Sequence, residues 1–217
     1  MMPSMKNRLF SVVMASLVWT GTIAPAYAQM PTTKRFPQIT VEELNAQQRP
    51  VAEEILKVSS VGLAGPYNPL LRSPLLADRM VKLLDYLRFN TSVPRRLNEF
   101  AILIQARLWT SQVEWVAHHP LAVKAGLAES VAEDLKAGRR PTGMKPDEEL
   151  VYDLSMELST QHKVSDATFA RAKGLLTDQQ IVDLVTVSGT YASVAMILAV
   201  AEEPAAGGQT PLQPIVR

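Results

Sequence analysis

The stretch Glu114-Trp115-Val116-Ala117-His118-His119 decides how this chain is interpreted, both as a fold and as a candidate site. It belongs to a segment expected to be helical as far as Ala125, because the glycine that follows is a typical helix stop. In a helix, Glu114 and His118 are four residues apart and share one face. A carboxylate is thereby paired with the one side chain whose unperturbed charge changes near neutral pH. The spacing therefore predicts an acid–base site on a helix.

The same pair has a simpler interpretation as an ordinary contact on a solvated helix. A metal site can in principle be drawn from Glu114, His118 and a third ligand. The sequence holds no H-E-x-x-H motif and no second ligand pair, however, so we expect no metal and no cofactor. His119 points about 100° away from His118 on an ideal helix, which favours a capping or interface role.

Signals for further helices lie on both sides of this stretch. Thr40 with Glu43, and Thr177 with Gln180, match the capping box that opens many helices. No segment shows the strict alternation of apolar and polar residues that is typical of a strand. The chain is therefore predicted to be all-α, a bundle of about eight helices. They are expected at residues 40–58, 73–89, 94–109, 111–125, 129–137, 146–161, 165–175 and 181–201.

The last predicted helix is apolar on nearly all sides. Such a helix has to be buried, either centrally or against another subunit. Its small residues, such as Gly189 and Ala192, would permit close contact with a neighbouring helix. We therefore expect a homo-oligomer.

The two ends of the chain differ in composition from the middle. Lys6 and Arg8 precede an apolar stretch too short to span a bilayer well, and small residues follow at Ala26 and Ala28. This pattern predicts a signal peptide over residues 1–28, cleaved after Ala28, and an exported protein, periplasmic in location. An uncleaved anchor is the alternative. We expect a linker at 29–39, one helical domain at 40–203 and a flexible, Gly/Pro-rich tail at 204–217.

Composition excludes several kinds of chemistry. The chain of 217 residues contains no cysteine, so disulfide redox and cysteine nucleophiles are absent. Without the first 28 residues, 20 basic and 21 acidic side chains remain. Such a nearly neutral chain argues against nucleic acid as a partner, because phosphate binding needs clustered Lys and Arg. Once the signal is removed, we expect no stable membrane insertion. Gly-rich phosphate loops, G-x-S-x-G motifs and dinucleotide fingerprints are also absent.

Several residues near the leading pair are further candidates. Glu99 lies among apolar neighbours, so its carboxylate is expected to be partly buried, with either a raised pKa or a structural ion pair with an arginine. Arg72, Arg96 and Arg107 are candidates for holding an anion, because guanidinium groups bind carboxylates in a bidentate way. Trp115 is a candidate for lining a pocket, although aromatic residues at helical spacing usually belong to a core.

Three groups of residues together resemble the carboxymuconolactone decarboxylase family. They are the segments GPYNPLLRSP at 65–74 and PRRLNEFAIL at 94–103, and the pair Glu114-Trp115 followed by HHPLA at 118–122 and AGL at 125–127. The resemblance covers residues 65–203. It implies an alkylhydroperoxidase-D-like helical bundle that assembles as trimers or hexamers.

The wider superfamily includes thiol peroxidases, in which a glutamate, a C-x-x-C pair and a histidine form the site. By resemblance, the glutamate corresponds to Glu99, the two cysteines to Ser111 and Glu114, and the histidine to His118. Both thiols are missing here. Because a serine hydroxyl cannot cycle through sulfenic acid and disulfide, we do not expect thiol peroxidase activity.

The resemblance implies a cofactor-free decarboxylase that acts on a carboxylated lactone, such as carboxymuconolactone or a related small acid, in aromatic compound catabolism. His118 is assigned as the proton donor, and Glu114 as the group that orients it and raises its pKa. Glu99 is assigned as a supporting or second acid–base group. The substrate-binding residues are predicted to be Arg96, Arg72, Ser111, Trp115 and His119.

Two other functions stay open at this stage. One is a related isomerase or lactone-processing enzyme. The other is an exported, non-catalytic oligomer that binds a small acid or another protein.

Overall fold

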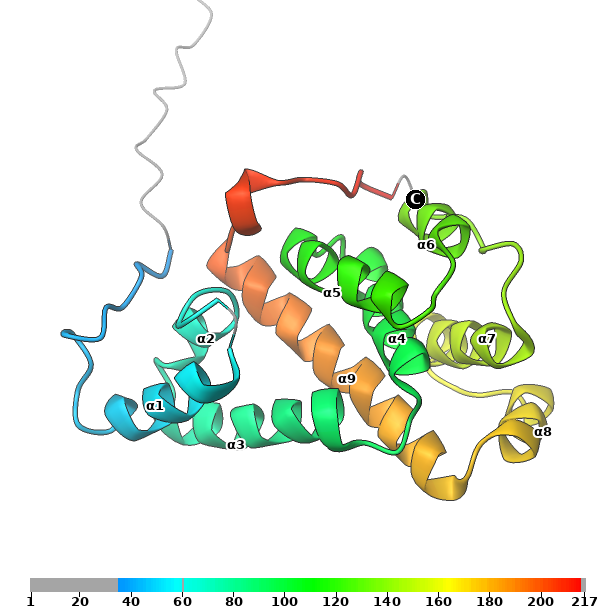
Figure 1. Cartoon of the computed structure of the whole chain (residues 1–217), viewed down its shortest axis with the longest axis horizontal. Helices are drawn as coiled ribbons and strands as arrows, with labels where there is room; N and C mark the ends of the chain where they lie inside the picture. Colours follow the sequence, from blue (N-terminus) through cyan, green and yellow to red (C-terminus); the bar gives the residue numbers. More distant parts are fainter. Residues whose placement is uncertain (1–34, 60, 216–217) are drawn as a thin grey trace, which may run out of the picture. The chain divides into compact units, whose positions relative to one another are not determined.

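The computed structural model describes residues 35–59 and 61–215, which lie within one compact unit. The expected signal peptide and most of the expected linker fall outside these residues. Every regular element in the described part is helical, which confirms the all-α class, with nine α-helices rather than eight (Figure 1). They are α1 (Gln48–Val58), α2 (Tyr67–Leu70), α3 (Pro74–Asp85), α4 (Arg95–Leu108), α5 (Gln112–Lys124), α6 (Glu129–Lys136), α7 (Pro146–Gln161), α8 (Asp166–Leu175) and α9 (Asp178–Ala201).

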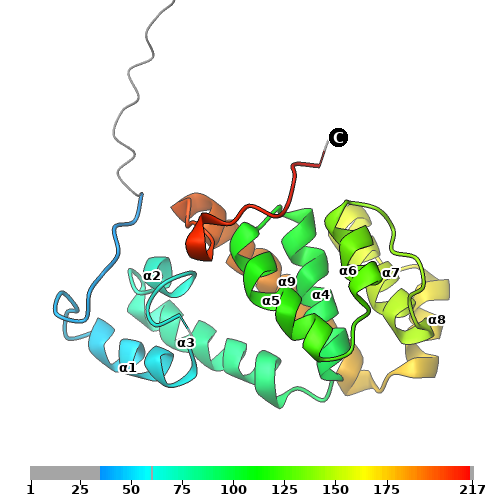
Figure 2. The ribbon, with the colours of Figure 1, turned by 45° about the horizontal axis from the view of Figure 1, so that its top comes forward.

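Helix α4 forms the centre of the unit. It packs against α5, α7 and α9, and Figure 2 shows it between α5 on one side and α6 and α7 on the other. All of its residues from Leu97 to Arg107 are buried. Polar groups inside such a helix need partners. The Asn98 side chain donates to the Leu87 carbonyl over 2.8 Å, and Gln105 donates to the Ser159 hydroxyl over 3.0 Å. Glu99, another buried polar residue of α4, belongs to the candidate site.

Helix α9 crosses the unit diagonally in Figure 1 and packs against α4. The expected capping box is present: the Thr177 hydroxyl accepts from the Gln180 amide, and the Gln180 side chain accepts from the Thr177 amide. By length and composition α9 could cross a membrane, but its buried face is that of a core helix. The sequence predicted that this helix is buried either centrally or against another subunit; one face does pack in the core, and an apolar stripe on the other face is exposed in the single chain. The stripe consists of Val182, Val185, Met196 and Val200.

The first helix begins later than predicted. Residues 40–43 form only a turn, in which the Glu43 carboxylate accepts from the Thr40 amide. A second reciprocal cap lies downstream: Asn45 accepts from the Gln48 amide, and the Gln48 side chain accepts from the Asn45 amide. Helix α1 therefore starts at Gln48.

A π-helical turn, η1 (Tyr86–Asn90), follows α3 where the sequence predicted one continuous α-helix. The Asp183 carboxylate of α9 holds both ends of this turn. It accepts from the Tyr86 hydroxyl at 3.1 Å and the Thr91 hydroxyl at 2.8 Å, and it also accepts from Ser92. Single π turns are uncommon and often mark functional sites.

The segment after α9, where the sequence predicted a flexible tail from residue 204, contacts the helices at Ala205 and Leu212 and is mostly exposed between them. Leu212 is buried. The Gln112 side chain makes two hydrogen bonds to the Leu212 backbone. It donates to the Leu212 carbonyl over 2.8 Å and accepts from the Leu212 amide over 3.0 Å. The Gly/Pro composition suggested disorder, but a single leucine with this reciprocal contact fixes the segment beside α5.

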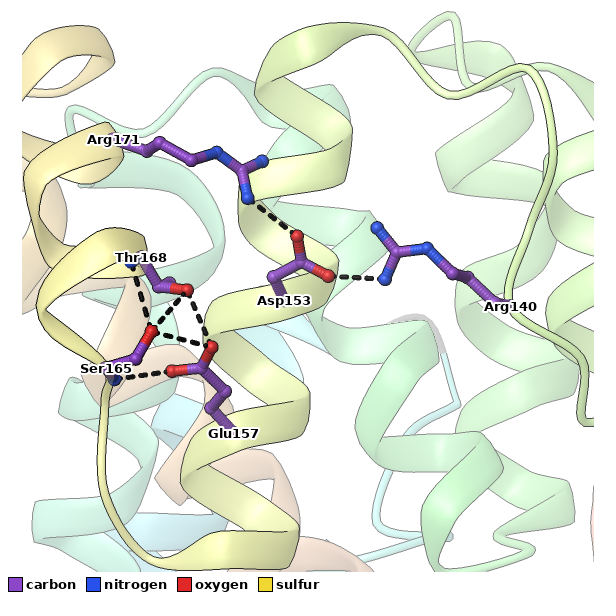
Figure 3. Close-up of polar contacts among 6 residues, drawn as sticks. All are labelled: Arg140, Asp153, Glu157, Ser165, Thr168 and Arg171. Atoms are coloured by element: carbon purple, nitrogen blue, oxygen red, sulfur yellow. Dashed lines mark hydrogen bonds and ion pairs between the residues drawn. The ribbon is translucent and has the colours of Figure 1, made fainter.

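Two polar clusters set the position of α8 against α7 (Figure 3). Asp153 of α7 pairs with Arg171 of α8 at 2.8 Å and also with Arg140. One turn further along α7, the Glu157 carboxylate accepts from the Ser165 amide and the Thr168 hydroxyl, at 2.7 and 2.6 Å. Because Ser165 is also the N-cap of α8, the start of that helix is fixed by α7.

Candidate active site

A cavity of about 440 Å³ opens beside α5 and α9, a volume within the ordinary range for small-molecule sites. Its remaining walls come from the loop before α2, from α3 and η1, and from the segment that follows α9. Most of the lining side chains are apolar. The titratable side chains on its wall are Tyr67, Arg88, Glu114, His118, Tyr191 and Glu203.

Glu99 and His118 form a buried pair at this cavity. His118 Nδ1 lies 2.7 Å from Glu99 Oε2, and their side chains are 8% and 2% exposed. Arg95 reaches the other Glu99 oxygen at 3.5 Å. The Tyr191 ring stands edge-on to the imidazole, with centroids 5.0 Å apart. Because the carboxylate occupies Nδ1 and the aromatic ring restricts the imidazole, His118 presents Nε2 to a bound molecule.

Glu114 lies on the same face of α5 as His118 and is also buried, but it has no partner. Neither of its carboxylate oxygens makes a hydrogen bond. Burial away from water raises the pKa of Glu114 to about 8, and the nearby Ser111 hydroxyl, which lies outside hydrogen-bond geometry, opposes this only in part. Glu114 therefore carries a proton at pH 7.

The predicted relation between the two residues of α5 is wrong in one respect. Glu114 was expected to orient His118, but the carboxylate that contacts the imidazole comes from Glu99 of α4. The helical spacing places Glu114 and His118 on one face, as predicted, but α4 supplies a nearer acceptor. The cavity thus holds a histidine with a carboxylate behind it and, separately, a protonated carboxyl group. This arrangement can accept a proton at one group and donate one from the other.

The two arginines predicted to bind substrate do not line the cavity. Arg96 is occupied by Asp147, at 2.6 Å, and by Glu148. Arg72 donates to the carbonyls of Asn68 and Pro37 at 2.6 and 2.5 Å, and so ties the segment before α1 to α2. Both side chains therefore make structural contacts within the fold.

The other three predicted binding residues lie near the site but outside its wall. Ser111 is the N-cap residue of α5, and its hydroxyl has no hydrogen-bond partner. Trp115 is buried, and its ring stacks on His119 with centroids 5.7 Å apart. His119 lies 3.0 Å from Glu129 of α6. These contacts favour the interface role for His119 over a role in binding substrate.

Arg88 lines the cavity, but it was not among the arginines predicted from the sequence to hold an anion. It lies in η1, and its guanidinium stands over the Phe89 ring at 4.8 Å. The 3.6-residue period of an α-helix predicts the wrong direction for this side chain. A π turn changes the angle at which the side chains project from the helix axis.

One group of three ligand side chains in the described residues is close enough to share a metal ion. It consists of His119, Glu129 and Glu133, and it lies outside the cavity wall. Lys136 already pairs with Glu133 at 3.0 Å. The catalytic candidates Glu99, Glu114 and His118 do not form such a group.

Comparison with known proteins identifies the class of fold. No family profile matches the chain, and no curated protein matches it in sequence. A solved structure is similar over 86% of this chain and 100% of its own, with a TM-score of 0.68 and 13% sequence identity. That structure is described as the alkylhydroperoxidase AhpD core of an uncharacterized peroxidase-related protein from Ralstonia eutropha JMP134. The chain therefore has the alkylhydroperoxidase-D-like fold, as the sequence predicted.

Proposed function

We propose that this protein is a cofactor-free acid–base enzyme, a carboxy-lyase that decarboxylates a small carboxylated lactone or a related acid. One observation carries the proposal: a mostly apolar cavity is lined by His118, which is backed by the buried Glu99, and separately by Glu114, which is buried without a hydrogen-bond partner. Buried ionisable groups with separated roles are typical of acid–base sites.

The reaction follows from these groups. When the carboxylate leaves as carbon dioxide, the electron pair of the broken bond moves into the conjugated lactone carbonyl, so the substrate itself delocalises the charge. His118, held by Glu99, hydrogen-bonds the resulting enolate oxygen when its imidazole is protonated. Glu114 then gives its proton to the carbon that lost the carboxylate, and solvent restores the proton to Glu114.

An isomerase is the second candidate, because the site contains a proton acceptor as well as a donor. In that reaction, neutral His118 removes a proton from carbon at Nε2, and Glu114 returns one at a conjugated position. Thiol peroxidase activity has no support, because Ser111 and Glu114 stand where that chemistry would need two cysteines, and the chain has none.

We further propose that the protein is exported and acts as a homo-oligomer. The basic and apolar pattern of the first 28 residues supports export. The exposed apolar stripe of α9 supports association with further copies.

The test is turnover on a panel of carboxylated butenolides, with carbon dioxide release and product mass as readouts. His118→Ala and Glu99→Gln should each lower kcat by about a hundredfold or more, the usual scale for a lost acid–base group. His162→Asn is the matched control, because His162 is exposed, lies outside the cavity and has the left-handed conformation that asparagine tolerates. Full turnover by His118→Ala would refute the assignment. Product of unchanged mass without carbon dioxide release would favour the isomerase.

A further inference from the structure

We propose that Arg88 binds a carboxylate of the substrate that is retained through the reaction, and that the leaving carboxylate lies elsewhere, beside Glu114 and His118. The inference rests on the proposed function, since it concerns the same cavity.

Arg88 is placed to receive an anion. It is half-buried on the cavity wall, and no carboxylate of the described residues lies within 4.0 Å of its guanidinium. Tyr191, which lines the same cavity, packs edge-on against the His118 imidazole.

Charge on the cavity wall restricts what the arginine can hold. Arg88 is the only arginine or lysine among the lining residues. Of the two lining glutamates, Glu114 is uncharged at pH 7, and Glu203 makes no ion pair with Arg88. One positive charge is thus available to a ligand, and it offers the planar donor pair that binds a carboxylate in a bidentate way.

The chemistry of decarboxylation decides which carboxylate this is. An ion pair stabilises a carboxylate in the ground state, and that stabilisation is lost when the group becomes neutral carbon dioxide. If Arg88 held the leaving group, it would raise the barrier. The surroundings of Glu114, in which its own carboxyl group has no hydrogen-bond partner, suit a group that loses its charge. Arg88 therefore suits the group that keeps its charge.

Equilibrium binding tests this inference without turnover. The probe is 2-naphthoate, a fluorescent monocarboxylate with an apolar body, and 2-naphthamide is its uncharged counterpart. Arg88→Gln should weaken naphthoate binding about ten- to hundredfold, the scale of a lost charge-assisted contact, and leave naphthamide binding unchanged. Arg88→Lys should restore part of the affinity. Arg79→Gln is the matched control, because Arg79 is exposed and lies outside the cavity wall.

The outcomes separate this inference from the proposed function. Equal affinity of the unmodified protein for naphthoate and naphthamide would overturn it, as would unchanged naphthoate binding by Arg88→Gln. If Arg88→Gln bound neither ligand, the cavity would be distorted and Arg88→Lys would decide. Naphthoate binding by Arg88→Lys that is as weak as that of Arg88→Gln would then overturn the charge-based role. If the binding results are as expected but no butenolide is turned over, the anion site stands and the decarboxylase proposal fails.

Discussion

Glu114 is a carboxyl group buried without a hydrogen-bond partner, and this environment links its proton to the stability of the whole fold. Its pKa is about 8 in the folded protein, against an ordinary value of 4.5. Between these values the unfolded chain releases the proton and the folded chain keeps it. The free energy of unfolding therefore falls as pH rises from about 4.5 to 8, by up to about 1.4 kcal/mol per pH unit, and this loss is complete above pH 8.

Replacement of Glu114 by glutamine should remove this dependence. The Glu114→Gln variant has no titrating group at this position, so its free energy of unfolding should change less between pH 5 and 8 than that of the unmodified protein. Urea denaturation at several pH values in this range measures the difference. Glu53→Gln serves as the control, because Glu53 is exposed. If the free energy of unfolding changed with pH in the same way for Glu114→Gln and the unmodified protein, the conclusion that folded Glu114 is protonated would be contradicted.

Single residues also show what the sequence could and could not predict about the site. Glu99, Glu114 and His118 were all identified, because helical spacing and the family motifs indicated them. The contact between Glu99 and His118 depends on how α4 packs against α5, and no local pattern specifies that packing. Arg88 was missed because its direction depends on a π turn, which the 3.6-residue period does not indicate.

Among the elements, η1 connects the packing of α9 to the cavity. Asp183, a buried residue of α9, accepts hydrogen bonds from Tyr86 at the start of the turn and from Thr91 and Ser92 just after it. The turn that carries Arg88 is therefore held at both ends by one carboxylate. Asp183 is a positioning residue, since it acts on the cavity through η1 and does not line the wall.

Asp183→Ala should lower both stability and anion affinity. The substitution leaves the Thr91 and Ser92 donors without their acceptor, at a cost of about 1–3 kcal/mol in the free energy of unfolding. Because Arg88 then loses its fixed position, naphthoate affinity should fall while naphthamide affinity changes little. Denaturation and fluorescence titration measure the two effects. Asp178→Ala, an exposed change on the same helix, is the comparison. If Asp183→Ala lost stability but kept full naphthoate affinity, Asp183 would have no positioning role.

At the scale of the whole molecule, α9 has apolar side chains on two faces. One face packs into the core through Leu184, Val187 and Val194, and the opposite stripe of Val182, Val185, Met196 and Val200 is exposed. An exposed apolar stripe on a long helix is typical of an interface. The sequence predicted the apolar character of this helix, but it could not show which side faces the core and which faces outward.

If the chains associate through this stripe, the mass of the protein in solution should exceed that of one chain. The unmodified full-length chain should have a mass in solution of at least twice 23.9 kDa, measured by light scattering after size-exclusion chromatography. Met196→Glu should reduce that mass toward the monomer, because a buried charge without a partner opposes association. Phe169→Glu provides the contrast, because Phe169 is an exposed apolar residue of α8 and is not part of the stripe. A monomeric unmodified chain would refute the homo-oligomer.

The overall fold was predictable to a large extent, and the reasons are physical. Capping residues and apolar periodicity fix α4 and the helices from α6 to α9 within a few residues. Errors arose where two local signals competed, as at Thr40 and Asn45, or where a distant contact decided the outcome. The pairing of Gln112 with Leu212, a hundred positions apart, is of the second kind.

That pairing has a consequence for how the protein would respond to limited proteolysis. The exposed residues Gly207 and Gly208 lie between the cavity wall, which includes Glu203 and Ala206, and the point at which Leu212 is held. A cut at these glycines would separate the wall segment from its tether and leave every α-helix intact. Ligand access to the cavity would then change while the helices stay folded. Early digestion should therefore affect ligand binding before it affects stability.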